Sequence, residues 1–203
     1  MPLRLIAVTS AVMIVFAGAL WRPAAIAAEK GSIVGQLLVA APSMPDPRFA
    51  ATVILIVEHS EKGALGFVVN RVNGHRPIAE VLQALGRDTS GVSGSIDIHW
   101  GGPVERKVAL VIHSRDYASK ATKPAPGGFA MTGDPSVLRA IALGKGPKRF
   151  FFVRGYAGWG PGQLERELER KAWVVVPADV SLVFARNHAR TWKRAFAKRG
   201  LDL

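Results

Sequence analysis

Two adjacent side chains, Glu58 and His59, are the best suited to acid–base chemistry in this chain. They follow an apolar run that ends at Val57, and ligands of open α/β sheets commonly bind at strand ends. A histidine exchanges protons near neutral pH, and a carboxylate can orient it, so the pair is a candidate for a hydrolase that activates water. Neighbouring residues of a strand point to opposite faces, however. The pattern therefore favours a structural role for the pair, such as closing a hairpin, over catalysis.

Metal and nucleophile chemistry have weaker signals. His59, His99 and His113 lie near the ends of expected strands, but their spacings match no local zinc motif. Ser43 and Ser114 lie outside any Gly-x-Ser-x-Gly elbow. The chain has no cysteine, which removes disulfides, thiolate metal sites and cysteine nucleophiles. We therefore expect no metal site and no cofactor.

The segment Gly155–Gln163 (GYAGWGPGQ) is the most distinctive stretch of the sequence. Its glycines predict a shaped loop that leads into a helix beginning at Pro161, whose free N–H groups could face an anion. Tyr156 and Trp159 could stack on a ligand, although packing in the core is the favoured interpretation. The segment lacks the lysine and hydroxyl of a phosphate-binding loop and the spacing of a dinucleotide site, so nucleotide binding is not expected.

A basic face is expected on the last helix, over residues 188–199. Arg190, Lys193, Arg194 and Lys198 lie there, and the formal net charge of the chain is +12. Such a face could make weak contact with an anionic membrane surface. Nucleic acid is a less favoured partner because no helix-turn-helix motif is evident. The alternative is a solvated helix back, with Trp192 and Phe196 stacked beneath it.

Residues 1–28 have the pattern of a secretory signal peptide. Arg4 precedes an uncharged, mostly aliphatic run over residues 5–21, and the small residues 24–28 fit a cleavage site. The run is somewhat short for a membrane span, but an uncleaved inner-membrane tether is an alternative. We expect a periplasmic or secreted protein. It would be cytoplasmic if translation began downstream, although a start at Met44 would discard the strand expected over residues 35–41.

The elements that would position these side chains alternate irregularly. Strands are expected over residues 35–41, 52–57, 66–70, 96–100, 108–113, 128–132, 149–153 and 173–176, and helices over residues 77–85, 135–143, 161–171 and 188–199. The run at residues 52–57 is apolar on both faces, which is typical of a covered central strand. With 49% hydrophobic residues, residues 29–203 are expected to form a single compact α/β domain with a mixed β-sheet flanked by helices.

Several landmarks together resemble the AlgH/YqgE family of bacterial proteins. They are the segments Pro42–Phe49, Thr52–Ile54, Glu58–His59, Gly63–Gly66, Asn70–Arg71, Gly101–Val104, His113–Ser114, Gly155–Trp159 and Gly162–Glu165. The resemblance covers nearly all of residues 33–203. It implies a compact α/β fold with a mixed sheet, a proposed regulatory role in alginate production and no established enzyme activity. Two departures are Val72, where the family often has proline, and Lys171, where asparagine is common. Because the family is generally cytoplasmic, the leader also argues against a transcriptional role.

The favoured function is a non-enzymatic, regulatory module that binds a ligand or partner outside the cytoplasm. Its site would gather distant segments around one recess, through Asp46, His59, Asn70, Arg71, Tyr156, Trp159 and Gln163. The partner would be an unknown protein or a small anionic ligand, for which the Arg71 guanidinium is the best donor. The alternatives are a hydrolase that uses Glu58 or His59 on water, and a basic protein that binds an anionic envelope surface or nucleic acid.

Overall fold

The computed structural model of the chain describes residues 31–200. The signal peptide expected over residues 1–28 lies outside the described residues. The strands are β1 (Gln36–Ala40), β2 (Val53–Ser60), β3 (Gly63–Val68), β4 (Val72–Pro77), β5 (Ser95–Trp100), β6 (Val104–Ser114), β7 (Thr122–Ala125), β8 (Phe129–Thr132), β9 (Phe150–Trp159) and β10 (Trp173–Pro177). The helices are α1 (Ile78–Ala84), α2 (Ser136–Ala142), α3 (Gln163–Glu169), α4 (Val180–Val183) and α5 (His188–Phe196), with a 3₁₀ turn at Pro126–Gly128.

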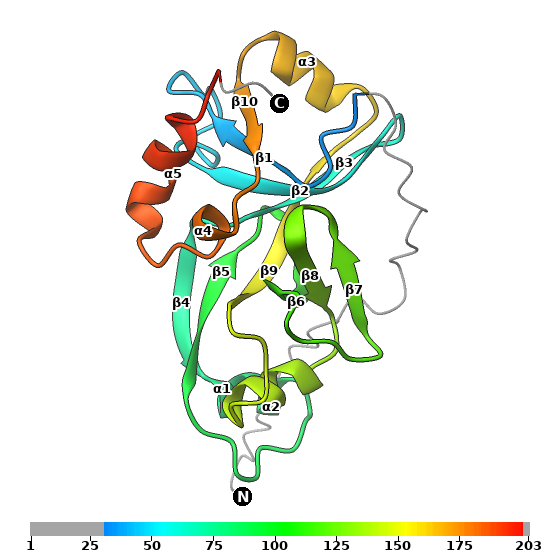
Figure 1. Cartoon of the computed structure of the whole chain (residues 1–203), viewed down its shortest axis with the longest axis vertical. Helices are drawn as coiled ribbons and strands as arrows, with labels where there is room; N and C mark the ends of the chain where they lie inside the picture. The colour runs from blue at the N-terminus through cyan, green and yellow to red at the C-terminus, as the bar shows by residue number, and fades with distance from the viewer. Residues whose placement is uncertain (1–30, 201–203) are drawn as a thin grey trace, which may run out of the picture.

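The strands form one curled sheet with two lobes (Figure 1). We call β10, β1, β2 and β3 the upper sheet and β4 to β8 the lower sheet, and β9 takes part in both. The strand order is β10-β1-β2-β3-β9-β6-β8-β7, and β5 joins β9 to β4. The pair β5–β9 is parallel and the other pairs are antiparallel, so the sheet is mixed as expected. Helix α3 lies at one end of the molecule, α1 and α2 at the other, and α4 and α5 at one side (Figure 1). The prediction of a mixed α/β domain is confirmed.

Strand β9 belongs to both sheets. Its first half, Phe150–Arg154, lies between β5 and β6 of the lower sheet, and its last residues, Ala157–Trp159, pair with β3 of the upper sheet. The sequence predicted a strand only as far as residue 153 and a loop over residues 155–162. That prediction was wrong for residues 155–159, because glycine was taken as a sign of a loop when it serves a close crossing of two chain segments.

The glycine crossing is the contact of Gly101–Gly102 with Gly155–Tyr156. A Cβ atom on Gly102 would lie 2.1 Å from the carbonyl carbon of Tyr156, and one on Gly101 would lie 2.2 Å from the carbonyl oxygen of Gly155. Gly155 also has a φ of 70°, which favours glycine. Two glycine motifs far apart in sequence are therefore required by the same backbone approach.

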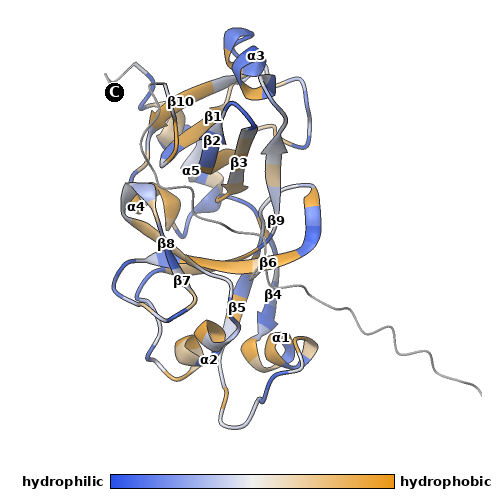
Figure 2. Ribbon diagram, turned by 90° about the vertical axis from the view of Figure 1, so that its right-hand side faces the viewer, coloured by the Kyte–Doolittle hydropathy of each residue, from blue (hydrophilic) through white to orange (hydrophobic). Residues whose placement is uncertain are grey.

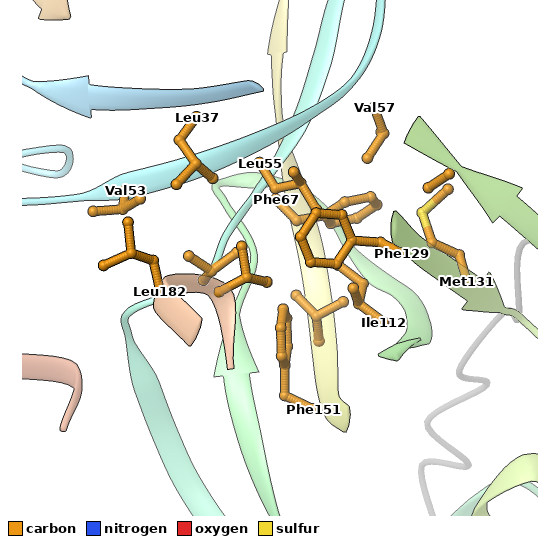
Figure 3. Packing of buried hydrophobic residues seen from close by; sticks show 14 of the residues in the cluster. Leu37, Val53, Leu55, Val57, Phe67, Ile112, Phe129, Met131, Phe151 and Leu182 are labelled. Atoms are coloured by element: carbon orange, nitrogen blue, oxygen red, sulfur yellow. The ribbon is translucent and has the colours of Figure 1, made fainter. Parts of the chain in front are cut away.

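Three apolar clusters hold the fold together. Alternate residues of one strand enter different clusters, as strand geometry requires: Leu37 and Val39 of β1 enter the central cluster, while Leu38 and Ala40 enter the upper one. The central cluster lies between the two sheets and includes Phe129 and Phe151 (Figure 3). The upper cluster lies against α3 and the lower cluster against α1 and α2. In Figure 2 the apolar colour follows β6 and the inner strands, and α3 presents a polar outer side.

Most of the expected elements are present. The hairpin of β2 and β3 is confirmed, and residues 53–56 are fully buried, as a covered central strand should be. The last helix is confirmed over residues 188–196, with Trp192 and Phe196 stacked at a ring-centroid distance of 5.4 Å. Strands β4 and β7 and helix α4 were not predicted. Strand β4 has the sequence VNGHRP, which is poor in strand formers and half-buried at most, so it exists through its pairing with β5.

Candidate functional site

A cleft of about 710 Å³ opens between the loop that follows β1 and helix α3. We call it the loop cleft. It is lined by Ser43, Met44, Pro45, Asp46, Arg48, Phe49, Pro103, Val104, Gly158, Trp159, Gln163, Glu167, Arg170, Ala172 and Trp173. These residues come from the loop at 42–49, the start of β6, the end of β9, helix α3 and the start of β10. Segments distant in sequence thus surround one recess.

The floor of the loop cleft is built around the carboxylate of Glu167. Its Oε2 atom accepts hydrogen bonds from the indole N–H groups of Trp159 (2.9 Å) and Trp173 (2.7 Å), and its Oε1 atom accepts one from the Gln163 amide (2.9 Å). The two indole rings meet edge to face, with centroids 6.1 Å apart. The carboxylate therefore holds both aromatic rings in place, so the floor of the cleft is rigid and preformed.

The opposite wall is the loop at residues 42–49, which is held by its own polar contacts. The Asp46 carboxylate accepts hydrogen bonds from the backbone N–H and guanidinium of Arg48, the latter at 2.7 Å, and this contact lowers the pKa of Asp46. Phe49 packs its ring against Trp173, with centroids 5.7 Å apart. Arg71 donates to the backbone carbonyl groups of Arg48 and Ala50. These contacts hold the loop in position across the cleft from α3.

The structure brings three of the predicted ligand-binding residues, Asp46, Trp159 and Gln163, into the lining of the loop cleft. Asn70 and Arg71 lie behind the loop instead. The Asn70 side chain is 9% exposed and bridges the backbone of Val53 and Ala51, through hydrogen bonds of 2.8 and 2.9 Å. The Arg71 guanidinium lies 5.3 Å from the Trp100 ring centroid, and burial lowers its pKa. Both side chains hold the loop rather than line its cleft.

His59 and Glu58 diverge, as strand geometry predicts. His59 faces α3, where its Nε2 atom lies 2.7 Å from Glu165 Oε1, and its Nδ1 atom accepts a hydrogen bond from the backbone N–H of Ile33. Because Nδ1 accepts, Nε2 carries the ring proton and donates a hydrogen bond to Glu165. Partial burial raises the pKa of Glu58, and its charge acts on Tyr156 on the other side of the sheet. The two side chains form no acid–base pair.

Tyr156 also lies outside the loop cleft. Its ring is half-buried against the central cluster. Burial, with the charges of Glu105 and Glu58, raises the pKa of its hydroxyl group. The expectation that the aromatic residues of the glycine-rich segment pack in the core therefore fits Tyr156, whereas Trp159 packs in the core and also lines the cleft.

The three histidines considered for zinc lie in separate environments. The His99 ring packs against Phe151 and meets the His188 ring edge-on, while His113 is fully buried and its Nε2 atom lies 2.9 Å from the Thr132 hydroxyl. Within residues 31–200, no group of three or more His, Asp or Glu side chains is arranged to hold a metal ion. Ser114 is hydrogen-bonded to Asp116, and Ser43 lies at the edge of the loop cleft.

The basic face expected on the last helix is only partly free. Arg190, Lys193 and Arg194 are exposed on α5. Lys198 follows the helix and pairs with Asp179 at 2.8 Å. Hydrogen bonds from Lys198 and Ser181 lower the pKa of Asp179 to about 2. The exposed basic face of α5 therefore consists of three cations, with Lys198 bound to the segment before α4.

Sequence reasoning placed the loop at residues 42–49 on the ligand-binding surface but missed part of the facing side of the cleft. Glu167, Arg170 and Trp173 were not selected, although they line it. One signal was available: Gln163 and Glu167 are four residues apart and share a helix face. The partners of that face, two tryptophans from different strands, follow only from the topology.

Comparison with known proteins assigns the chain to a family. A profile of the AlgH-like family matches residues 37–203. The chain belongs to the AlgH-like family. It is 40% identical to a UPF0301 protein of Methylococcus capsulatus over 182 residues, which cover 90% of this chain and 100% of the relative. It is 42% identical to a UPF0301 protein of Afipia carboxidovorans over 177 residues, 83% of this chain and 84% of the relative.

Solved structures of two proteins agree with this AlgH-like assignment. The solution structure of the AlgH protein from Pseudomonas aeruginosa matches with a TM-score of 0.71 and 38% identity, covering 86% of this chain and 92% of that one. A crystal structure of a Corynebacterium diphtheriae protein matches with a TM-score of 0.64 and 25% identity, covering 83% and 87%. The function of the AlgH-like family is uncharacterised. In residues 31–200, no helix is both long enough and apolar enough to span a membrane.

Proposed function

We propose that this AlgH-like protein is a non-catalytic binding module that acts outside the cytoplasm and takes a ligand or partner segment into the loop cleft. The observation that carries the proposal is the preformed floor of that cleft, in which one carboxylate fixes two indole rings. Preformed, mostly apolar recesses with a few oriented polar groups are the usual form of a ligand site, because little ordering remains to be done on binding.

The chemistry of the cleft indicates what would bind. Met44, Phe49 and Trp173 offer apolar surface, while Glu167 is already engaged by three N–H groups. Arg48 is paired with Asp46, so the cation best placed to receive a charge is the exposed Arg170 at the rim. The expected occupant is an apolar group next to an acidic one, on a partner protein or a small anionic ligand.

Binding without catalysis is supported by the state of His59. Both of its ring nitrogens are engaged, by the Ile33 amide and by Glu165, so no lone pair is free to take a proton from water. Glu58 lies on the other side of the sheet, near Tyr156. The proposed location outside the cytoplasm rests on the leader pattern in residues 1–28 alone.

Native mass spectrometry of the protein purified from its own source tests the binding proposal. We expect a retained mass on the wild type, and its loss in Arg170→Glu and in Met44→Asp. The control is Arg166→Glu, an exposed arginine on the same helix outside the cleft lining, which should keep the mass. Thermal melting would establish that all variants fold. Equal retention by wild type and Arg170→Glu, or a wild type that carries and captures nothing, would contradict the proposal.

A second candidate function is weak attachment to an anionic envelope surface through α5. The observation that favours it is the exposure of Arg190, Lys193 and Arg194 on one short helix whose other side is buried through Thr191 and Ala195. Such a face can lie against phospholipid headgroups without unfolding any part of the core.

A further inference from the structure

A second recess lies beside α5, separate from the loop cleft. This α5 cavity has a volume of about 300 Å³, and no residue of its lining is shared with the loop cleft. It is lined by Ile96, Asp97, His99, Phe150, Phe151, Val183, Phe184, Ala185, Arg186 and His188. These residues come from β5, β9, α4, the segment between α4 and α5, and the first residue of α5. In Figure 1, α4 lies beside the upper end of β5.

The α5 cavity contains a buried polar atom with no partner. His99 is 3% exposed, and its Nδ1 atom has no hydrogen bond. Burial lowers the pKa of His99 to about 4, so the ring is neutral at neutral pH, and its hydrogen bond with the backbone of Val69 acts against that shift. A backbone contact that favours the protonated ring is one in which the ring N–H donates. The proton of the neutral ring is therefore on Nε2, and Nδ1 presents a lone pair.

A buried acceptor without a partner is costly, and the group that satisfies it must be a hydrogen-bond donor. His188, the first residue of α5, has an unpartnered buried Nδ1 atom as well, and its ring stands edge-on to that of His99 with centroids 5.0 Å apart. Two nitrogens at one cavity thus lack partners, in a chain where buried polar atoms are otherwise mostly paired.

The rest of the lining supplies two opposite charges and an apolar wall. The Asp97 carboxylate is close enough for its charge to act on both imidazoles, and its Oδ1 atom lies 2.8 Å from His75 Nδ1. Arg186 lies at the exposed side. The apolar part of the lining comes mainly from Phe150, Phe151, Val183 and Phe184.

This combination matches a zwitterion with an apolar substituent. We propose that the α5 cavity binds a free amino acid with an apolar side chain, its ammonium group directed to Asp97 and His99 Nδ1 and its carboxylate to Arg186. An ammonium donates three hydrogen bonds, and a guanidinium suits a carboxylate. The volume is at the lower end of that of small-molecule sites, which fits an amino acid.

His188 is the movable part of this site. His99 is fixed against Phe151, with ring centroids 4.7 Å apart, and its Nδ1 atom is shielded from solvent. His188 is half-buried at the start of α5, with its ring edge-on to that of His99, and the proposed binding requires its ring to turn aside. Binding would therefore change the environment of both imidazoles and stabilise the join between α4 and α5.

Titration of the full-length protein with L-leucine and L-phenylalanine tests the proposal, with isothermal calorimetry for affinity and histidine side-chain NMR for location. We expect saturable binding, a rise in melting temperature and a shift of the His99 Nδ1 signal. N-acetyl-leucine, which lacks the ammonium group, and leucinol, which lacks the carboxylate, should each bind about tenfold more weakly or worse, since each loses a charge-assisted hydrogen bond.

The variants Asp97→Asn and Arg186→Gln should each weaken leucine binding by about tenfold without unfolding the protein, because both side chains are exposed. The matched controls are Asp88→Asn and Arg190→Gln, which lie outside the cavity lining and should bind as the wild type does. Absence of saturable binding, equal affinity in Asp97→Asn and the wild type, or binding that leaves the His99 signal unchanged would each overturn the proposal. None of these outcomes bears on the loop cleft, which is tested separately.

Discussion

Glu167 shows how much one side chain contributes to the candidate site. Its carboxylate is the common acceptor for two indole groups and one amide, so it joins α3 to the end of β9 and the start of β10. Charge-assisted hydrogen bonds of this kind are stronger than neutral ones, and losing the acceptor leaves the donors without partners. The rigidity of the loop cleft therefore depends on Glu167, which cannot be told apart in the sequence from an ordinary surface glutamate.

Replacing Glu167 with alanine should lower the free energy of unfolding by about 2 kcal/mol, because two largely buried indole N–H groups lose their acceptor. Denaturant unfolding followed by tryptophan fluorescence measures this directly. Glu169→Ala, at an exposed position on the same helix, should change stability by less than about 0.5 kcal/mol. Similar effects in the two variants would show that Glu167 does not organise the floor.

His99 should make stability depend on pH. Its pKa in the folded protein is about 4, against an ordinary value of 6.5, because burial disfavours the charged ring. Between these two values the unfolded chain binds the extra proton, so the free energy of unfolding falls as the pH decreases from about 6.5 to about 4. The shift corresponds to about 3 kcal/mol. When the free energy of unfolding is measured against pH across this range, the slope should be smaller for His99→Gln than for the wild type. Parallel curves would contradict the assignment of this pH dependence to His99.

Among the elements, β9 is the one on which the others depend. It pairs with three strands and joins the two sheets. The hydrophobic runs predicted its first half, since periodicity and β-branched residues are local signals. Its second half was predicted as a loop, because Gly155 and Gly158 suggest turns unless the partner strands are known. The contacts that explain Gly155 come from Gly102 and Val104, about fifty residues earlier.

The glycine crossing can be tested with a pair of alanine substitutions. Gly102→Ala should destabilise the protein by about 3 kcal/mol or more, because the added Cβ atom would meet the backbone of Tyr156. Gly144→Ala is the control: its φ is also positive, 69°, but no atom lies within 4 Å of the new Cβ atom. It should cost only about 1 kcal/mol from backbone strain. Equal melting temperatures for the two variants would rule out the crossing as the reason for the glycines.

At the scale of the whole molecule, the basic charge predicted from the sequence is distributed unevenly. Some of it is engaged in ion pairs, such as Arg48 with Asp46 and Lys198 with Asp179, and some is exposed on α5. The net charge therefore indicates only a general attraction to anions. The exposed face of α5 is where we propose that this attraction acts.

The double variant Arg190→Glu/Arg194→Glu should reduce binding to vesicles that contain anionic phospholipid by at least about tenfold at low salt, because each cation contributes about 1 kcal/mol near such a surface. Co-sedimentation at two ionic strengths measures it. Lys145→Glu/Lys148→Glu makes the same charge change at the exposed segment after α2 and is the control. Equal losses in both doubles would assign the effect to net charge, and no loss in either would remove the membrane proposal.

The sequence predicted the fold class and most elements, because apolar alternation along strands and caps of helices are local. It predicted the candidate site only in part. Asp46, Trp159 and Gln163 were selected and line the loop cleft, but Asn70 and Arg71 were selected for their hydrogen-bonding groups, which the fold uses to hold backbone carbonyl and amide groups. A polar side chain has the same appearance in sequence whether its partner is a ligand or its own chain.

The pairing of β1 with β10 determines when the newly synthesised chain can finish folding. Residues 36–40 find their outer neighbour only in residues 173–177, and the strand shared by both lobes begins at residue 150. A nascent chain truncated before that point lacks the central strand of one lobe and the closing edge of the other. Long-range pairing of this kind slows folding. The two ends of the domain must therefore both be synthesised before either lobe is finished, and the protein should acquire protease resistance in a single late step.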